Sequence, residues 1–264
     1  MLVELIGHPG SGKSTLLAEI DSTSDPTFSS MLTNQEYQEL DRARGERSIM
    51  KSSRLRRWIR VLPVFWRHPR LASRVVVLMI LHGRPFFRRL RKAERLLAHV
   101  IFTDELLETF PGRIIVHQDG FLQCLWSMLI ESRSLRGTRL IESLFEIYYL
   151  PRNPLLVGLE VDDRIATRRV FNRISRGRFN RDSSPRRRAE FGKWLARHHE
   201  LVELLPASLR RERIDGDGTV SCVMSEFAAV LDRHMPRLLR RPTRSAVASR
   251  QSANLTTAPR RIRP

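Results

Sequence analysis

The sequence predicts an α/β fold in which parallel strands alternate with helices. Three apolar runs support this, because each leads through a short polar turn into a helix-forming segment: LVELI (2–6), RIIVH (113–117) and LLVGLEV (155–161). Strands that alternate with helices in this way are typical of parallel sheets covered on both faces. With 264 residues, 41% of them apolar, the chain is long enough for one main core.

The first apolar run is followed by GHPGSGKST, which fits the phosphate-loop (Walker A) pattern G-x-x-x-x-G-K-[ST]. Glycines let successive backbone N–H groups face a phosphate chain, and the helix expected from residue 12 to 20 adds its positive dipole end. Lys13 would bring a charge to the outer phosphates, and Ser14 would hold Mg²⁺. We therefore predict an ATP site formed by Gly7, His8, Pro9, Gly10, Ser11, Gly12, Lys13, Ser14 and Thr15.

Residues 35–108 are predicted to be mainly helical, after a weak strand at 27–32. Apolar residues recur at helical spacing from Phe86 to Val100, with arginines between them, which indicates one buried and one basic face. The preceding stretch WIRVLPVFWRHPR mixes aromatic residues with arginines, and we expect Pro63 and Pro69 to break it. Such a stretch could rest in a lipid interface, stack on a base or cap the core.

The second apolar run ends in Gln118-Asp119-Gly120, before a helix expected at 121–130. A carboxylate at the carboxyl end of a strand can reach Mg²⁺ beside a phosphate loop. Asp119 could instead accept the proton of an attacking hydroxyl, or it could be an ordinary turn residue. We predict a catalytic or metal-binding Asp119 and leave the choice between these two roles open.

The third apolar run leads into Asp162 and an arginine-rich helix. Arg169, Arg173 and Arg176 are spaced four and three residues apart, so they share one helix face. Like charges at this spacing repel one another unless an anion lies among them, and a nucleotide's phosphate chain is the obvious candidate. The alternative is a solvated basic face. We predict that the three arginines close over the transferring phosphoryl group.

The net charge of +19 is concentrated in two segments. Residues 42–99 carry 17 Lys and Arg against two acids, and residues 236–264 carry eight Arg and no acid. These segments could contact an anionic membrane surface, another polyanion or an acidic partner. The composition of 236–264, rich in Arg, Ser, Thr and Pro, predicts a disordered tail, and a tail without function is an equal alternative.

Several features predict a cytoplasmic protein. The longest apolar run, residues 75–81, is far too short for a transmembrane segment, and a strand beginning at Leu2 leaves no room for a signal peptide. Cys124 and Cys222 lie far apart in no metal-binding pattern, so we expect two buried structural thiols in a reducing compartment. The basic segments would allow peripheral binding at the inner face of the membrane.

The order of these motifs resembles the thymidylate-kinase-like group of P-loop nucleoside and nucleotide kinases. The carrying motifs are GHPGSGKST, IIVHQDG, LLVGLEVDDRIATRRVFNRISRGR, a helix at 191–205 and a final strand entering Ile214-Asp215-Gly216-Asp217. The resemblance implies a P-loop NTPase three-layer fold, with a parallel sheet of about five strands flanked by helices. It also implies that Asp162 and Ala166 precede the arginines of a lid over ATP.

From this resemblance we expect a kinase-like domain at 1–235, with a basic helical substrate or insertion region at 42–110 and a lid region at 162–190, followed by the basic tail. The chain departs from thymidylate kinases in two ways. No arginine follows Asp119, and the basic segment 42–99 replaces the usual substrate-binding section. The resemblance therefore leaves the phosphoryl acceptor open.

Three function classes remain compatible with the sequence. The first is a kinase that transfers the γ-phosphoryl group of Mg-ATP to a nucleoside, nucleotide or sugar. The second is a nucleotide-dependent regulatory or assembly ATPase that contacts a membrane or an acidic partner, and the third is an ATPase acting on nucleic acid. A GTPase switch is not expected, because the sequence contains no N-K-x-D segment. The oligomeric state stays open, a homodimer included.

Overall fold

The protein is described by a computed structural model that covers residues 1–28, 31–33, 54–82, 86–130, 135, 137–175 and 185–234. Its centre is a five-stranded sheet in which all neighbouring strands are parallel, in the order β2-β3-β1-β4-β5. The strands are β1 Leu2–Ile6, β2 Met31–Thr33, β3 Ile114–His117, β4 Leu155–Glu160 and β5 Arg210–Asp215. The predicted fold class is confirmed.

The register places the candidate site at the carboxyl ends of the central strands. Glu4 of the central strand β1 lies opposite His117 at the end of β3, and Ile6 lies opposite Gly158 in β4. The carboxyl ends of parallel strands point the same way. The phosphate loop after β1, the turn after β3 and the start of the helix after β4 therefore meet at these ends, where ligands bind in open α/β sheets.

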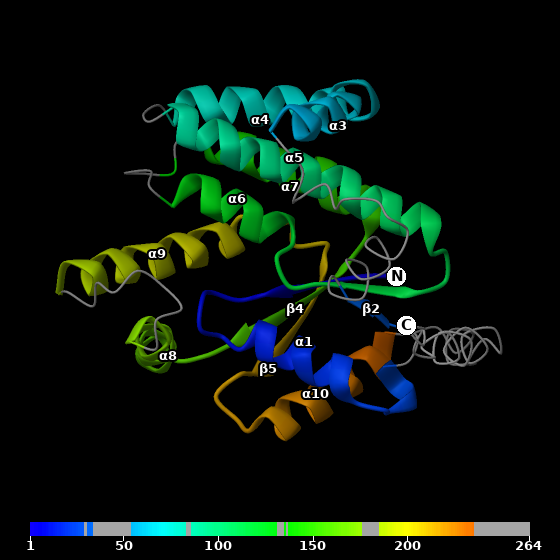
Figure 1. The fold of residues 1–264 in the computed structure, drawn as a ribbon, viewed down its shortest axis with the longest axis vertical. Coiled ribbons are helices and arrows are strands. Elements are labelled where there is room, and N and C mark those ends of the chain that lie inside the picture. Colours follow the sequence, from blue (N-terminus) through cyan, green and yellow to red (C-terminus); the bar gives the residue numbers. More distant parts are fainter. Residues whose placement is uncertain are drawn as a thin grey trace, which may run out of the picture.

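One face of the sheet is covered by α1 (Lys13–Ser22) and α10 (Val220–His234), which lie below it in Figure 1. Alternate residues of the strands supply the apolar surface on this side, as a period of two requires. Val3 and Leu5 of β1 pack here, in one cluster with Leu16 of α1 and Phe227 of α10.

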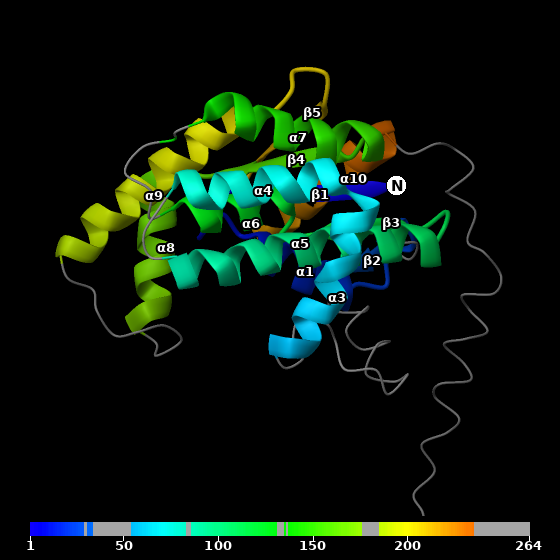
Figure 2. The same ribbon diagram turned by 90° about the horizontal axis from the view of Figure 1, so that it is seen from above.

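The other face carries a thicker helical layer (Figure 1). Its helices are α5 (Phe86–Thr109), α6 (Phe121–Leu129), α7 (Thr138–Arg152) and α9 (Pro185–Glu203). Farther from the sheet lie α3 (Arg54–Arg67) and α4 (Pro69–Leu81), and α3 runs across α4 rather than along it (Figure 2). The helix α8 (Asp163–Ser175) follows β4, and the short η1 (Pro26–Phe28) precedes β2.

Where the structure describes residues 35–108, the helical expectation is met at 54–67, 69–81 and 86–108, with one correction. Pro63 does not break the chain but lies inside α3, whereas Pro69 begins α4, where a missing N–H costs nothing. The apolar stripe of α5 is buried at Ala93, Leu97 and Val100, as its spacing predicts. Among the described residues, the weak strand expected at 27–32 is formed at 31–33, and the whole of segment 34–53 lies outside the described residues along with the tail 236–264.

The exposure of the two cysteines and of Trp66 tests two of the sequence-based expectations. Cys222 is exposed and Cys124 is partly buried, so the expectation of two buried thiols is wrong. Trp66 on α3 is 86% exposed, with Leu62 and Phe65 also exposed nearby, which rules out core capping for Trp66. Within the described residues, every helix is too short or too polar to traverse a bilayer.

Candidate nucleotide-binding site

The loop from Gly7 to Gly12 takes the backbone conformation that its glycines permit. Gly10 has a φ of +92° and Gly12 a φ of +100°, values that a residue with a Cβ adopts only under strain. The N–H groups of Thr15 and Leu16 both reach the Gly12 carbonyl at 2.9 Å, which starts α1 directly after the loop. The positive end of α1 therefore opens onto the loop, as an anion site requires.

Lys13 is buried against this loop, with 8% of its surface exposed. Its ammonium group donates to the Gly7 carbonyl, to the His8 carbonyl at 3.3 Å and to Ser11 Oγ at 3.4 Å. The side chain thus folds back over the loop rather than into solvent. Ser14 and Thr15 are exposed at the first turn of α1. The nine predicted residues thus form the loop and the first turn of α1, with the Lys13 side chain packed against the loop.

Asp119 follows β3 by two residues, and its side chain remains accessible to solvent. The surrounding protein removes part of its hydration, which raises the pKa of the carboxyl, while the charge of Lys13 acts in the opposite direction. The two predicted site residues are therefore close enough for their charges to interact. A hydroxyl at Ser14 and a carboxylate at Asp119 are oxygen donors of the kind that Mg²⁺ prefers, so the residues fit such an ion.

Glu4, which the sequence analysis did not single out, holds the turn that carries Asp119. Its Oε1 accepts the Leu122 N–H at 3.1 Å and the Tyr149 hydroxyl at 2.9 Å. A carboxylate at the start of α6 satisfies a free N–H and interacts favourably with the helix dipole. A Cβ on Gly120 would lie 1.9 Å from the carboxyl carbon of Glu4. Glycine beside Asp119 is thus required by the buried acid beneath it.

The second oxygen of Glu4 is buried and has no hydrogen-bond partner among the described residues. Burial raises the pKa of this carboxyl to about 7, and the bonds from Tyr149 and Leu122 offset only part of that effect. Glu4 is therefore a buried acid with one paired and one unpaired oxygen, on the strand that leads to the phosphate loop.

The structure gives only part of the predicted arginine clamp. Arg169 donates to the Gly216 carbonyl at 3.0 Å and lies 3.5 Å from the Gly10 carbonyl, so it ties α8 to the phosphate loop. The side chain of Arg173 and the whole of Arg176 lie outside the described residues. Asp162, at the start of the predicted lid region, caps α8, because its Oδ1 accepts the Arg164 N–H at 2.8 Å.

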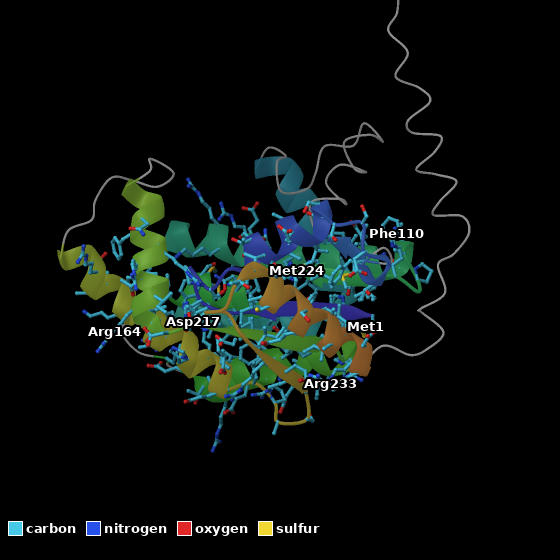
Figure 3. The ribbon with its side chains drawn as sticks, turned by 90° about the horizontal axis from the view of Figure 1, so that it is seen from below. Met1, Phe110, Arg164, Asp217, Met224 and Arg233 are labelled. Carbon is cyan, nitrogen blue, oxygen red and sulfur yellow. The ribbon has the colours of Figure 1, made fainter. Side chains whose placement is uncertain are left out.

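A cavity of about 460 Å³ lies between α8 and α9. Its lining is rich in arginine, with Arg164, Arg168 and Arg188 around Phe171. Figure 3 shows Arg164 near the start of α8 on the same side of the molecule as Asp217, and Asp217 accepts the Asp162 N–H at 3.1 Å. The lining of the cavity also includes Asp163, whose Oδ1 lies 3.7 Å from His8 Nε2, so the cavity adjoins the phosphate loop; Arg169 is not among the lining residues.

Three histidines gather beside the loop, and only His8 was predicted. The rings of His8, His198 and His199 have centroids 6.2 Å apart in all three pairings. Asp163 Oδ1 lies 3.7 Å from His8 Nε2 and 3.6 Å from His199 Nε2. His198 and His199 come from α9, far from the loop in sequence. The adjacent His pair on a predicted helix was the available signal, but nothing in the sequence placed that helix beside Gly7.

A parallel sheet of order β2-β3-β1-β4-β5, with a phosphate loop between its central strand and α1, defines the α/β fold of P-loop NTPases. Sheet, loop and following helix are all present in this chain.

No protein-family model and no curated protein matches the sequence. Among solved structures, the chain is similar to deoxyadenosine kinase from M. mycoides with bound dATP, at 14% identity and a TM-score of 0.44. It is also similar to that kinase with bound dCTP, at 13% and 0.47, and with its products dCMP and a flexible dCDP, at 11% and 0.47. Each comparison covers 88% of this chain and 100% of the other.

At this identity and TM-score, the likenesses carry no argument about activity. The fold assignment rests on this chain's own strand order and phosphate loop. Membership of the thymidylate-kinase-like group stays a prediction.

Proposed function

We propose that the protein is a phosphotransferase that binds Mg-ATP at the phosphate loop and transfers the γ-phosphoryl group to a small hydroxyl-bearing molecule. The observation that carries the proposal is that Lys13 and Asp119 follow two neighbouring parallel strands and lie close enough for the charge of Lys13 to act on the pKa of Asp119. Phosphoryl transfer needs mainly positioning and charge stabilisation, and this arrangement offers both.

In this proposal Lys13 and the loop N–H groups neutralise the phosphate chain. The raised pKa of Asp119 makes its carboxylate a stronger base, while Lys13 favours the ionised form. Asp119 would then accept the proton of the attacking hydroxyl. Glu4 would act indirectly, because it fixes the N-terminus of α6 and hence the turn on which Asp119 lies. Mg²⁺, when bound through Ser14, would supply charge stabilisation at the phosphates; if Asp119 is instead its second ligand, this carboxylate is not the proton acceptor.

The first experiment is thermal unfolding with and without Mg-ATP. A ligand that binds only the folded state raises stability by mass action, by about 2.7 kcal/mol at a concentration 100 times Kd. Lys13→Ala should abolish this shift, and Lys193→Ala, at an exposed position of α9, should retain it. Equal stabilisation of both variants would refute the nucleotide site.

The second experiment measures ATP consumption with panels of nucleosides, nucleotides and sugars. Acceptor-dependent turnover that Asp119→Asn removes would support the phosphotransferase. ATP binding without turnover on any acceptor would favour a regulatory protein.

A second candidate function follows from the outer face of α3 and α4. Leu62 and Trp66 on α3 and Ile80 on α4 are exposed, and Arg67 and Arg70 lie beside the α3–α4 junction. Apolar side chains among arginines suit an anionic lipid surface. A nucleotide-dependent ATPase held at such a surface should sediment with anionic vesicles, lose this on Trp66→Ser, and hydrolyse ATP faster with vesicles present.

A further inference from the structure

His198 is a buried polar side chain whose hydrogen-bonding groups are unused. It is 3% exposed, and neither ring nitrogen has a hydrogen-bond partner among the described residues. Its ring touches others only edge-on, with centroids 6.0 Å from Trp126 and 6.2 Å from His8. A buried donor or acceptor without a partner costs about 1–3 kcal/mol. An apolar residue would fill this position without that cost, so packing alone does not explain a histidine here.

The position of α9 brings His198 to the phosphate loop. Trp126 of α6 donates its indole N–H to the Trp194 carbonyl at 3.0 Å, which fixes α9 against α6 one helical turn before His198. His8 belongs to the loop itself, and its Nε2 contacts the Val161 carbonyl at 3.2 Å. His198 therefore faces the loop from the side opposite α1.

The surroundings of His198 select an anion as its partner. Lys13, His8 and His199 face the ring from the loop and from α9, and Trp126 faces it from α6. Burial and the charge of Lys13 lower the pKa of His198 to about 3, so the ring is neutral near pH 7. Asp163 is the nearby acid, and it lies against His8 and His199. The charge of Lys13 favours an anion beside His198, and no metal-binding cluster occurs within the part of the chain described.

We propose that His198 is a phosphate-binding residue, which donates a ring N–H to a phosphoryl oxygen of a ligand held at the phosphate loop. This inference rests on the phosphate-binding part of the proposed function and adds a residue to it. Access is no greater obstacle than for Lys13, which is itself only 8% exposed.

A pH dependence follows from the same geometry. A polyanion beside His198 favours the imidazolium form and opposes the effect of Lys13, so it raises the pKa of the bound histidine. Ligand binding should then be accompanied by proton uptake. The affinity should rise as the pH falls from 8 to 6, and it should rise more in the wild type than in a variant without His198.

The test is calorimetric titration of the full chain with Mg-ATP and with inorganic tripolyphosphate, at pH 6 and pH 8. The variants are His198→Leu, His198→Gln and, as the control on the same helix, Lys193→Gln at an exposed position. A lost hydrogen bond to a charged group predicts that His198→Leu weakens binding of both ligands about 10- to 100-fold at pH 6. His198→Gln should restore part of the affinity but not the pH dependence, and Lys193→Gln should change affinity less than about threefold.

The possible outcomes separate this inference from the proposed function. If the wild type binds tripolyphosphate and His198→Leu binds it equally well, His198 is not a phosphate-binding residue, although the nucleotide site stands. If the wild type binds neither ligand, both proposals fail. If His198→Leu does not fold, His198→Gln decides, since a tripolyphosphate affinity equal to that of the wild type at both pH values would overturn the inference.

Discussion

The molecule contains two clusters of buried histidines, and they differ in how their polar atoms are paired. In the helical layer, Thr103 of α5 links His99 and His117. Its hydroxyl donates to the His99 carbonyl at 2.9 Å and lies 3.5 Å from His117 Nε2. Tyr148 of α7 completes this core cluster by donating to Thr103 Oγ1 at 3.2 Å. Beside the phosphate loop, by contrast, His198 has neither nitrogen paired among the described residues.

This difference separates a structural histidine from a functional one. Burial lowers the pKa of His117 to about 4 and that of His99 well below its usual value, and burial together with the charge of Lys13 lowers the pKa of His198 to about 3, so these three rings are neutral near pH 7. The core cluster places its neutral rings where hydroxyls can bond to them, which stabilises the fold. The loop cluster places His198 beside Lys13 without a bond, which is expected of groups reserved for a ligand.

The largest effect is expected at the centre of the core cluster. Tyr148 is fully buried and stacks on Phe121 with a centroid distance of 4.0 Å. Tyr148→Ala should lower the free energy of unfolding by about 3–5 kcal/mol in urea titrations, because it opens a cavity and removes a partner from Thr103. Leu150→Ala, at a half-exposed position of the same helix, should cost less than about 1 kcal/mol. Similar losses in both variants would contradict this assignment.

Glu4 is an intermediate case, with one oxygen paired and one unpaired. A folded-state pKa of about 7, raised from 4.5, means that Glu4 binds protons more tightly in the folded state. Its contribution to stability is therefore complete below pH 4.5 and is lost as the pH rises through 7, by up to about 3 kcal/mol. Glu4→Gln should remove this loss.

The measurement is the difference in unfolding free energy between wild type and Glu4→Gln, from pH 4 to 8. The difference is needed because His117 and His198 have lowered pKa values and act in the opposite direction below pH 6.5. Parallel pH curves for the two proteins would show that Glu4 does not titrate in this range.

A pair of matched substitutions tests the comparison directly. His99→Leu leaves the Tyr148 hydroxyl with one partner fewer and should cost about 1–3 kcal/mol. His198→Leu removes unpaired polar atoms, so it should leave the free energy of unfolding unchanged or raise it by up to about 1 kcal/mol. Urea titrations without ligand measure both. Equal destabilisation would mean that His198 has a partner outside the described residues.

The smallest effect is expected for Asp163, whose contacts with His8 and His199 are long and partly solvated. Its side chain is 57% exposed, so Asp163→Asn should change the free energy of unfolding by less than about 1 kcal/mol. Asp162→Ala should cost more, about 0.5–2 kcal/mol, because it removes the cap of α8. Thermal unfolding of the two variants side by side gives the order, and the reverse order would make Asp163 a supporting part of the loop cluster.

The fold was largely predictable from the sequence, because local patterns determine it. The spacing in GHPGSGKST, and the positions of β3 and β4 before their polar turns, correspond to the structure within a few residues. The helix α7 was not predicted, although it buries both Tyr148 and Tyr149. Pro63 was read as a break because a proline inside a helix is costly in isolation, a cost that helix packing at Val61 and Val64 can outweigh.

The candidate site was predictable only where it follows the strands. Lys13 and Asp119 could be placed together because both follow neighbouring parallel strands. Glu4 could not be identified, since an acid within a strand usually faces solvent, and here its burial depends on Tyr149 from α7. His198 depends on how α9 packs against α6, a contact between segments about 70 residues apart that no local spacing encodes.

Arg169 contacts both the phosphate loop and the turn between β5 and α10, so local opening of one segment should affect the other. One guanidinium nitrogen bonds to the Gly216 carbonyl between β5 and α10 and approaches the Gly10 carbonyl. Local opening of the phosphate loop would therefore loosen the β5–α10 turn, and a ligand that closes the loop should slow amide hydrogen exchange in both segments. In Arg169→Ala the ligand should still protect residues 7–12, but residues 216–219 should exchange at the ligand-free rate. The arginine would then connect the motions of two turns that are about 200 residues apart in the sequence.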